Sequence, residues 1–225
     1  MKRSILFDTE TTGLDPATGD RVIEVAALEL VDDLPTGECY HVLIDPERDI
    51  PEEASRVHGF RREDLIGKPK FAEVADGFLA FVGNDPLIAH NARFDFNFMN
   101  AELEACQRPT LPAARMVDTL EMAKKRFPGL PNSLDALCRR FDIDLSARTT
   151  HNALLDCKLL AEVYLELMGG RQRGLGLVDQ RGGGGSAVYQ RDPARKPRVM
   201  APPSPEECAA HEIFVGGLKD PIWLR

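Results

Sequence analysis

Acidic residues at three places along this chain stand beside apolar residues, and this pattern constrains the fold more than any other feature. Asp8 and Glu10 follow an apolar run near the start, Asp95 lies in one apolar helical pattern, and Asp156 lies in another. A carboxylate that is buried without a partner is costly because it loses its hydration. One such acid could pair with a lysine or an arginine. Four acids that converge from distant segments require divalent cations instead.

The spacing within these segments suits a site for two metal ions. Alternate side chains of a β-strand share a face, so Asp8 and Glu10 can reach the same ions. Carboxylate oxygens are hard ligands and favour Mg²⁺ or Mn²⁺. Two such ions about 4 Å apart can hold the attacking and leaving oxygens of a phosphodiester. An attacking water also needs a base, and His151, which precedes Asp156 in the chain, is the candidate.

Length and composition favour a cytoplasmic protein with one main domain. The 225 residues suffice for one well-packed core and an appendage, and no segment approaches the apolar length of a membrane span. The N-terminus leads straight into a strand-like run, so we expect no signal peptide. The five cysteines form no CxxC pair and are odd in number. That pattern favours reduced thiols over a disulfide framework or a zinc site.

Charge is distributed unevenly along the chain. The net charge is −8, of which residues 1–170 carry −11 and residues 171–225 carry +3. A strongly acidic body argues against tight binding of duplex nucleic acid irrespective of sequence. It does not exclude a substrate of a few nucleotides that is held chiefly by bound metals.

Apolar periodicity and turn residues predict an α/β domain with a mixed sheet flanked by helices. We expect strands at residues 5–8, 22–31, 39–44 and 86–89. We expect helices at residues 71–82, 95–106, 118–127, 133–141 and 153–168. Turn residues occupy 13–16 and 32–37.

Three sequence motifs together resemble a known enzyme family. They are Phe7–Leu14 (FDTETTGL), Asn91–Asp95 (NARFD) and His151–Asp156 (HNALLD). In the same order, and over about residues 3–170, they resemble the DEDD exonucleases that carry a histidine in the third motif. Within that family, residues 57–59 and 132–138 are similar to segments of the proofreading subunits of bacterial replicative DNA polymerases.

The resemblance implies a ribonuclease-H-like fold in residues 1–170 and hydrolysis of DNA from its 3′ end with release of 5′-mononucleotides. It implies that two divalent cations, Mg²⁺ or Mn²⁺, are bound by Asp8, Glu10, Asp95 and Asp156, and that His151 is the base. It also implies contacts with the terminal nucleotide from a further set of residues, namely Glu10, Thr11, Gly13, Glu53 and His58. Arg93 departs from the small residue expected at its position, so its role stays open.

Beyond residue 170 the composition changes. Residues 171–205 are rich in glycine and proline and predict a flexible linker, whereas apolar residues return in 206–225. Residues 172–177 resemble the sliding-clamp-binding pattern Q-x-x-L-x-L, with Gln172, Leu175 and Leu177 as the contacts. The end of the chain resembles the tryptophan-containing terminus by which the proofreading subunits dock on the polymerase catalytic subunit. Phe214, Trp223 and Leu224 are the expected contacts.

Simpler interpretations exist for each part. Asp8 could cap a turn, Asp95 could N-cap a helix, and His58 could be a buried, hydrogen-bonded core histidine. Three functions therefore stay open: a proofreading 3′–5′ exonuclease acting on a DNA 3′ end, a stand-alone DEDD exoribonuclease, and a non-catalytic scaffold of the replisome. The apolar tail favours the first over the second, and the intact acids with His151 argue against the third.

Overall fold

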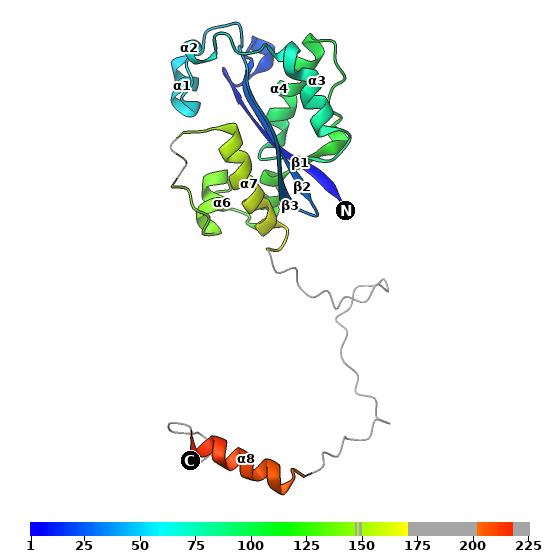
Figure 1. Ribbon diagram of the computed structural model, residues 1–225. Coiled ribbons are helices and arrows are strands. Elements are labelled where there is room, and N and C mark those ends of the chain that lie inside the picture. Colours follow the sequence, from blue (N-terminus) through cyan, green and yellow to red (C-terminus); the bar gives the residue numbers. More distant parts are fainter. Residues whose placement is uncertain (147, 149, 171–201, 218–225) are drawn as a thin grey trace. The chain divides into compact units, whose positions relative to one another are not determined.

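The computed structural model describes residues 1–146, 148, 150–170 and 202–217. The chain forms two compact units, residues 1–176 and 177–225, and each is described by itself. The first unit is built around one sheet with helices on both faces (Figure 1). In the second unit the structure describes one helix, α8 (Pro205–Gly216). None of the helices in these ranges has the length and apolar character needed to span a membrane.

The sheet has five strands in the order β3-β2-β1-β4-β5. Their bounds are β1 Arg3–Thr11, β2 Val22–Val31, β3 Leu34–Leu43, β4 Leu87–Ala89 and β5 Met116–Asp118. Strands β1, β2 and β3 pair antiparallel, whereas β4 is parallel to both β1 and β5. The predicted mixed sheet flanked by helices is confirmed.

Seven α-helices of the first unit surround this sheet. They are α1 Glu52–His58, α2 Arg62–Leu65, α3 Phe71–Val82, α4 Ala92–Ala105, α5 Thr119–Arg126, α6 Leu134–Arg140 and α7 Ala153–Leu167. Helix α3 has the predicted bounds. The sequence analysis missed α1, α2, β5 and α8. The first three are too short for an apolar period to emerge.

Helix α8 follows a capping motif that the sequence analysis overlooked. Ser204 Oγ accepts a hydrogen bond from Glu207 N at 3.2 Å, and Ser204 N donates to Glu207 Oε2 at 2.7 Å. Pro205 takes the first helical position, where a missing N–H costs nothing. The sequence Ser-Pro-Glu-Glu is therefore a readable helix start.

The turn predicted at residues 32–37 is present but ends earlier than expected. The chain reverses at Asp32 and Asp33, which have φ angles of 51° and 67°, and β3 begins at Leu34. Two consecutive left-handed residues form the tight turn whose twist matches that of the paired strands, and aspartate tolerates this conformation. The turn is thus shorter than the polar composition suggests, and β3 is longer.

Two apolar layers hold the sheet. Ile5 and Phe7 of β1 pack with residues of α3 and α4, including Phe78 and Phe96. Leu6 points to the other face, where it packs in the layer that contains residues of α5, α6 and α7. Because side chains alternate along a strand, Asp8 and Glu10 continue on the α7 side of β1.

Candidate active site

The acidic motifs meet at the carboxyl end of β1. All nine residues that the sequence analysis assigned to metal binding, catalysis or the terminal nucleotide line one cavity of about 690 Å³. They are Asp8, Glu10, Thr11, Gly13, Glu53, His58, Asp95, His151 and Asp156. The lining comes from four stretches of sequence, within residues 8–20, 51–58, 90–95 and 151–156, so the convergence is a property of the tertiary fold.

Asp95 reaches the cavity because the chain turns sharply between β4 and α4. Asn91 has a φ of 67° and is the N-cap of α4, which places Asp95 in the first turn of the helix. The interpretation of Asp95 as a helix cap is therefore wrong. Its Oδ1 accepts hydrogen bonds from Thr9 N at 3.1 Å and Thr9 Oγ1 at 2.8 Å. These bonds tie α4 to β1 beside Asp8.

The start of α7 is held against the sheet by Glu24 of β2, which is fully buried. Glu24 lies opposite Glu10 in the β1–β2 register. Its carboxylate accepts hydrogen bonds from Asn152 Nδ2 at 2.8 Å and Ala153 N at 3.1 Å. Asn152 Oδ1 in turn accepts from Leu155 N at 3.1 Å and caps the helix. These contacts set His151 and Asp156 next to Glu10.

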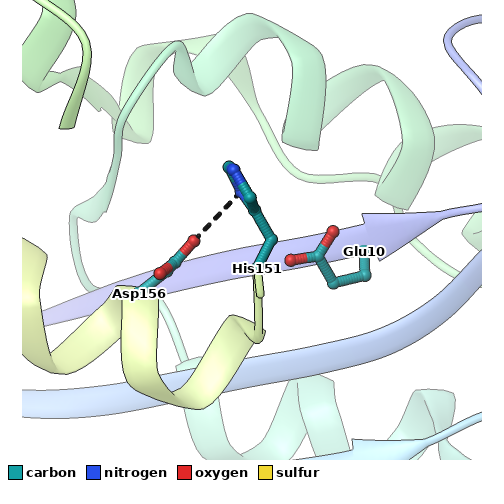
Figure 2. A group of neighbouring side chains, drawn as sticks. All are labelled: Glu10, His151 and Asp156. Carbon is teal, nitrogen blue, oxygen red and sulfur yellow. Dashed lines mark ion pairs between the residues drawn. The ribbon is translucent and has the colours of Figure 1, made fainter. Parts of the chain in front are cut away.

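Glu10, His151 and Asp156 form the tightest group in the cavity. Each offers a ligand atom, and these atoms all lie within 4.8 Å of one another. Figure 2 shows Glu10 on β1 facing His151 and Asp156, with the His151 Nδ1–Asp156 Oδ2 contact of 3.4 Å dashed. Asp8 and Asp95 line the same cavity but do not belong to this group. The two carboxylates belong to the predicted donor set for divalent cations, and the imidazole of the predicted base lies beside them.

The electrostatics of the acids also fit a cation. Burial, and then the charges of Glu24 and Asp156, raise the pKa of Glu10 to about 8. Burial raises the pKa of Asp95 to about 7, although its hydrogen bonds from Thr9 act in the opposite direction. The pKa of Asp8 is raised well above its ordinary value by burial and by Asp95 and Glu10. Bound positive charge would relieve this repulsion.

An arginine that the sequence analysis missed contacts this group. Arg148 donates from Nε to Asp156 Oδ1 and from Nη2 to Asp156 Oδ2, both at 2.6 Å. Its Nη1 donates to Asp135 Oδ1 at 2.5 Å, and Nη2 lies 3.0 Å from His151 Nδ1. Burial alone would raise the pKa of Asp156, but the bonds from Arg148 hold it below its ordinary value. The only sequence signal is a basic residue shortly before His151.

His58 lines the cavity, and its imidazole is held by a backbone contact. Its Nδ1 accepts from Phe60 N at 3.1 Å, which leaves the ring proton on Nε2. Burial, and then the nearby His151, lower the pKa of His58 to about 4, so the ring is neutral. Among the described residues Nε2 has no hydrogen-bond partner. His58 is thus buried and hydrogen-bonded through Nδ1, as the simpler interpretation expects, and it also lines the cavity.

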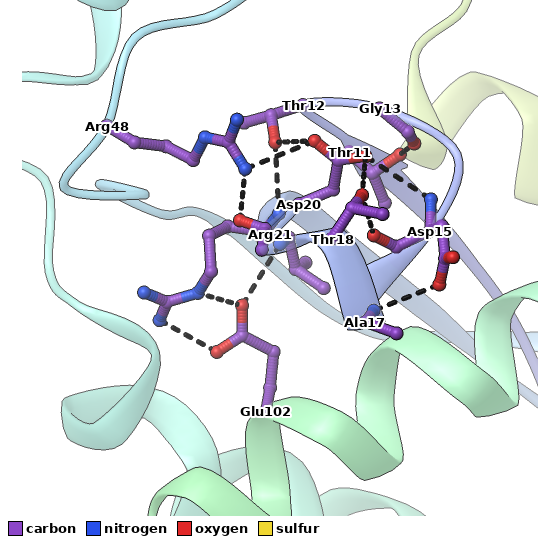
Figure 3. Close-up of polar contacts among 12 residues, drawn as sticks. Thr11, Thr12, Gly13, Asp15, Ala17, Thr18, Asp20, Arg21, Arg48 and Glu102 are labelled. Atoms are coloured by element: carbon purple, nitrogen blue, oxygen red, sulfur yellow. Dashed lines mark hydrogen bonds and ion pairs between the residues drawn. The ribbon is translucent and has the colours of Figure 1, made fainter.

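The loop that carries Thr11 and Gly13 is held by a polar network (Figure 3). Thr11 Oγ1 donates to Gly13 O at 2.6 Å, and Asp20 Oδ1 accepts from Thr12 Oγ1 at 3.3 Å. Arg48 Nη1 pairs with the same carboxylate at 3.1 Å. A Cβ atom on residue 13 would lie 2.1 Å from Asp20 Oδ2, so a larger residue there would require the Asp20 side chain or the loop to move.

The expected contacts with other proteins are mostly outside the described residues. Phe214 lies in α8 and its exposed fraction is 64%. The remaining residues, Gln172, Leu175, Leu177, Trp223 and Leu224, fall in segments that the structure does not describe.

Comparison with known proteins is consistent with this geometry. The exonuclease family RNase_T matches residues 5–164. The chain is 45% identical over 223 residues to the DNA polymerase III subunit epsilon of Rickettsia conorii, covering 95% of each chain. It is 43% identical over 225 residues to the same subunit of Escherichia coli K12, covering 94% of this chain and 91% of the relative.

Solved structures share the fold. Exonuclease X in complex with 5′-overhanging duplex DNA superposes with a TM-score of 0.58 and 25% identity, covering 75% of this chain and 91% of that one. The E. coli exonuclease I–single-stranded DNA complex gives a TM-score of 0.64 at 20% identity, covering 76% of this chain and 41% of that one. The predicted ribonuclease-H-like fold is thereby confirmed. The chain belongs to the RNase_T exonuclease family and, within it, to the epsilon subunits of DNA polymerase III.

Proposed function

We propose that this chain is a 3′–5′ exonuclease that proofreads DNA synthesis by removing mispaired 3′-terminal nucleotides as 5′-monophosphates. The observation that carries the proposal is the convergence of Asp8, Glu10, Asp95, Asp156 and His151 on one cavity. Membership of the epsilon family supports DNA as the substrate and a polymerase as the setting.

Two divalent cations, Mg²⁺ or Mn²⁺, would be held by Asp8, Glu10, Asp95 and Asp156. The fit rests on the donor set of four carboxylates in one cavity. Burial raises the pKa values of Glu10 and Asp95, and bound positive charge would favour their ionised forms. When bound, such ions supply a nucleophile from water and stabilise charge on the phosphodiester oxygens.

His151 would take the proton of the attacking water. Its side chain is about half exposed, at 49%, so it can exchange protons with solvent. Its Nδ1 lies 3.4 Å from Asp156 Oδ2, and Nε2, which lies 3.4 Å from Arg148 Nη2, would take the proton. Asp156 orients the ring and stabilises its charged form.

The cavity would receive one unpaired nucleotide. His58, Glu53, Thr11 and Gly13 line it and would contact that nucleotide, the last two through their backbone. A mispaired terminus separates from its template at lower cost than a paired one. Selection for errors would then arise from the easier unpairing, and the cavity need not read the base.

The tail would place the enzyme in the cytoplasmic replisome. We infer three parts: the exonuclease domain at 1–170, a flexible linker at 171–205 and a terminal peptide at 206–225. Gln172, Leu175 and Leu177 would bind the sliding clamp, and the terminal peptide would bind the polymerase catalytic subunit. A flexible tether gives an effective concentration near millimolar, which offsets weak DNA binding by an acidic domain.

The test is release of labelled mononucleotides from a primer in Mn²⁺, with paired and mispaired 3′ ends and an RNA of the same sequence. We expect faster release from the mispaired DNA, and none from Asp156→Ala. Asp76→Ala, an exposed acid on α3 outside the cavity, is the matched control and should keep full activity. Preference for the RNA would favour the exoribonuclease, and no release from any substrate would favour a non-catalytic scaffold.

A further inference from the structure

The guanidinium of Arg148 is largely buried beside the proposed metal site. The exposed fraction of its side chain is 8%, and that of Asp156 is 5%. The guanidinium donates to both oxygens of the Asp156 carboxylate at 2.6 Å, and Nη2 also lies 3.0 Å from His151 Nδ1. Paired donors of this kind make the strongest contacts between arginine and a carboxylate.

These contacts involve two members of the three-residue group. Glu10, His151 and Asp156 bring their ligand atoms within 4.8 Å of one another, and Arg148 touches the latter two. A divalent cation bound by this group would lie close to a fixed positive charge. The guanidinium of Arg148 and a divalent ion would also compete for the oxygens of Asp156. The ion pair between Arg148 and Asp156 is therefore suited to the metal-free protein.

A second ion pair, with Asp135, would hold Arg148 if its guanidinium moved away from Asp156. Arg148 Nη1 donates to Asp135 Oδ1 at 2.5 Å, and Asp135 is on α6 with a side chain that is 40% exposed. Arg148 itself lies in the connection between α6 and α7, which has no helix or strand at the positions the structure describes. Arg148 can therefore release Asp156 and keep its contact with Asp135.

We propose that Arg148 is a positioning residue that holds Asp156 in the metal-free protein in place of a cation and yields at least one carboxylate oxygen when a divalent ion binds. This inference rests on the metal site of the proposed function. It makes Arg148 oppose metal binding, whereas an arginine that only orients Asp156 would assist it. The two roles therefore predict opposite changes in the Kd for Mn²⁺ when Arg148 is replaced.

The experiment compares Arg148→Gln with wild type in the full chain. Isothermal titration calorimetry gives the Kd for Mn²⁺, and thermal unfolding gives Tm in EDTA and in Mn²⁺. We expect Arg148→Gln to lower the Kd for Mn²⁺ on the order of tenfold, because a like charge and a competitor are removed. We expect a lower Tm in EDTA, because the acids lose their counterion, and a larger rise in Tm on adding Mn²⁺.

Arg21→Gln is the matched control. Arg21 also makes a two-pronged contact, with the buried Glu102 at 2.7 and 2.8 Å, but it does not line the cavity. This variant should lower Tm and leave the Kd for Mn²⁺ unchanged. If Arg148→Gln does not fold, Arg148→Lys serves instead. A single ammonium group cannot bridge both oxygens, so the Kd should shift in the same direction by a smaller factor.

Unchanged or weaker Mn²⁺ binding by the Arg148 variants would overturn the inference while leaving the proposed function intact. Absence of Mn²⁺ binding by the wild-type chain would overturn the metal assignment, and this inference with it.

Discussion

Glu24 accepts a hydrogen bond from Asn152 at 2.8 Å across 128 residues of sequence, and this contact joins β2 to the start of α7. The same carboxylate accepts from the backbone N–H of Ala153 and lies 2.7 Å from His41 Nε2. In the sequence, His151 precedes the two residues that Glu24 holds, Asn152 and Ala153, and Asp156 follows them. The position of both residues relative to Glu10 therefore depends on a buried acid outside the cavity lining.

Replacing Glu24 should damage both stability and activity. Glu24→Ala leaves the side-chain amide of Asn152 and the N–H of Ala153 without their acceptor, and each loss costs about 1–3 kcal/mol. We expect a clear fall in the free energy of unfolding, measured with urea, and a lower kcat at saturating Mn²⁺. Glu121→Ala, which breaks an exposed pair with Lys124, should change neither by much. Equal effects of the two substitutions would contradict this role.

The metal-free protein should become less stable as pH rises from about 4.5 to 8. Glu10, with an ordinary pKa of 4.5, has a pKa of about 8 in the folded protein, and Asp95 shifts from 3.8 to about 7. The folded state thus keeps protons that the unfolded chain releases in this window, so the free energy of unfolding falls with pH.

The measurement is Tm in EDTA and in Mg²⁺ at pH 5.5 and pH 8. We expect a lower Tm in EDTA at pH 8 and a larger gain from Mg²⁺ there. Glu10→Gln cannot ionise, so its Tm in EDTA should fall less over the same interval. If Glu10→Gln shows the wild-type fall, other groups govern the pH dependence.

His151→Ala should lower turnover by about 10²–10⁴-fold, the usual contribution of a general base. The acidic limb of the pH–rate profile should disappear with it, because that limb reports protonation of the base. His211→Ala, on the exposed surface of α8, is the control and should match wild type. An acidic limb that persists in His151→Ala would assign it to another group.

Gly13→Ala should impair substrate binding more than the chemical step. The added Cβ would lie 2.1 Å from Asp20 Oδ2, so the Asp20 side chain or the loop that carries Thr11 must shift. We expect KM for single-stranded DNA to rise on the order of tenfold with a smaller change in kcat. Adding Asp20→Ala should restore part of the loss, because it removes the clashing carboxylate. Gly216→Ala, whose Cβ would meet nothing within 4 Å, should leave KM unchanged.

Truncation after Pro205 should separate hydrolysis from assembly. The shortened chain keeps every residue that lines the cavity, so degradation of free single strands should be unchanged. It lacks Phe214, Trp223 and Leu224, and a buried tryptophan anchor often contributes more than about 2 kcal/mol to an interface. Co-elution with the polymerase catalytic subunit on size exclusion should therefore be lost. Undiminished co-elution would place the main contact on residues 1–205.

The sequence alone determined the local structure and the chemistry of the motifs. The bounds of α3 follow from apolar periodicity over neighbouring residues. Alternation along β1 placed Asp8 and Glu10 on one face, and the three ordered motifs indicated the family. All of these signals extend over a few residues, where the backbone geometry is set by its own neighbours.

Only the tertiary structure decided which side chains support the motifs. Glu24 looks like an exposed acid in an apolar strand, and Arg148 looks like a loop charge, until the fold brings them to the start of α7. The carboxylate of Asp20 occupies the space where a side chain on residue 13 would lie, which no local pattern reveals. Contacts between segments far apart in the chain depend on strand register and helix packing, which no local pattern specifies.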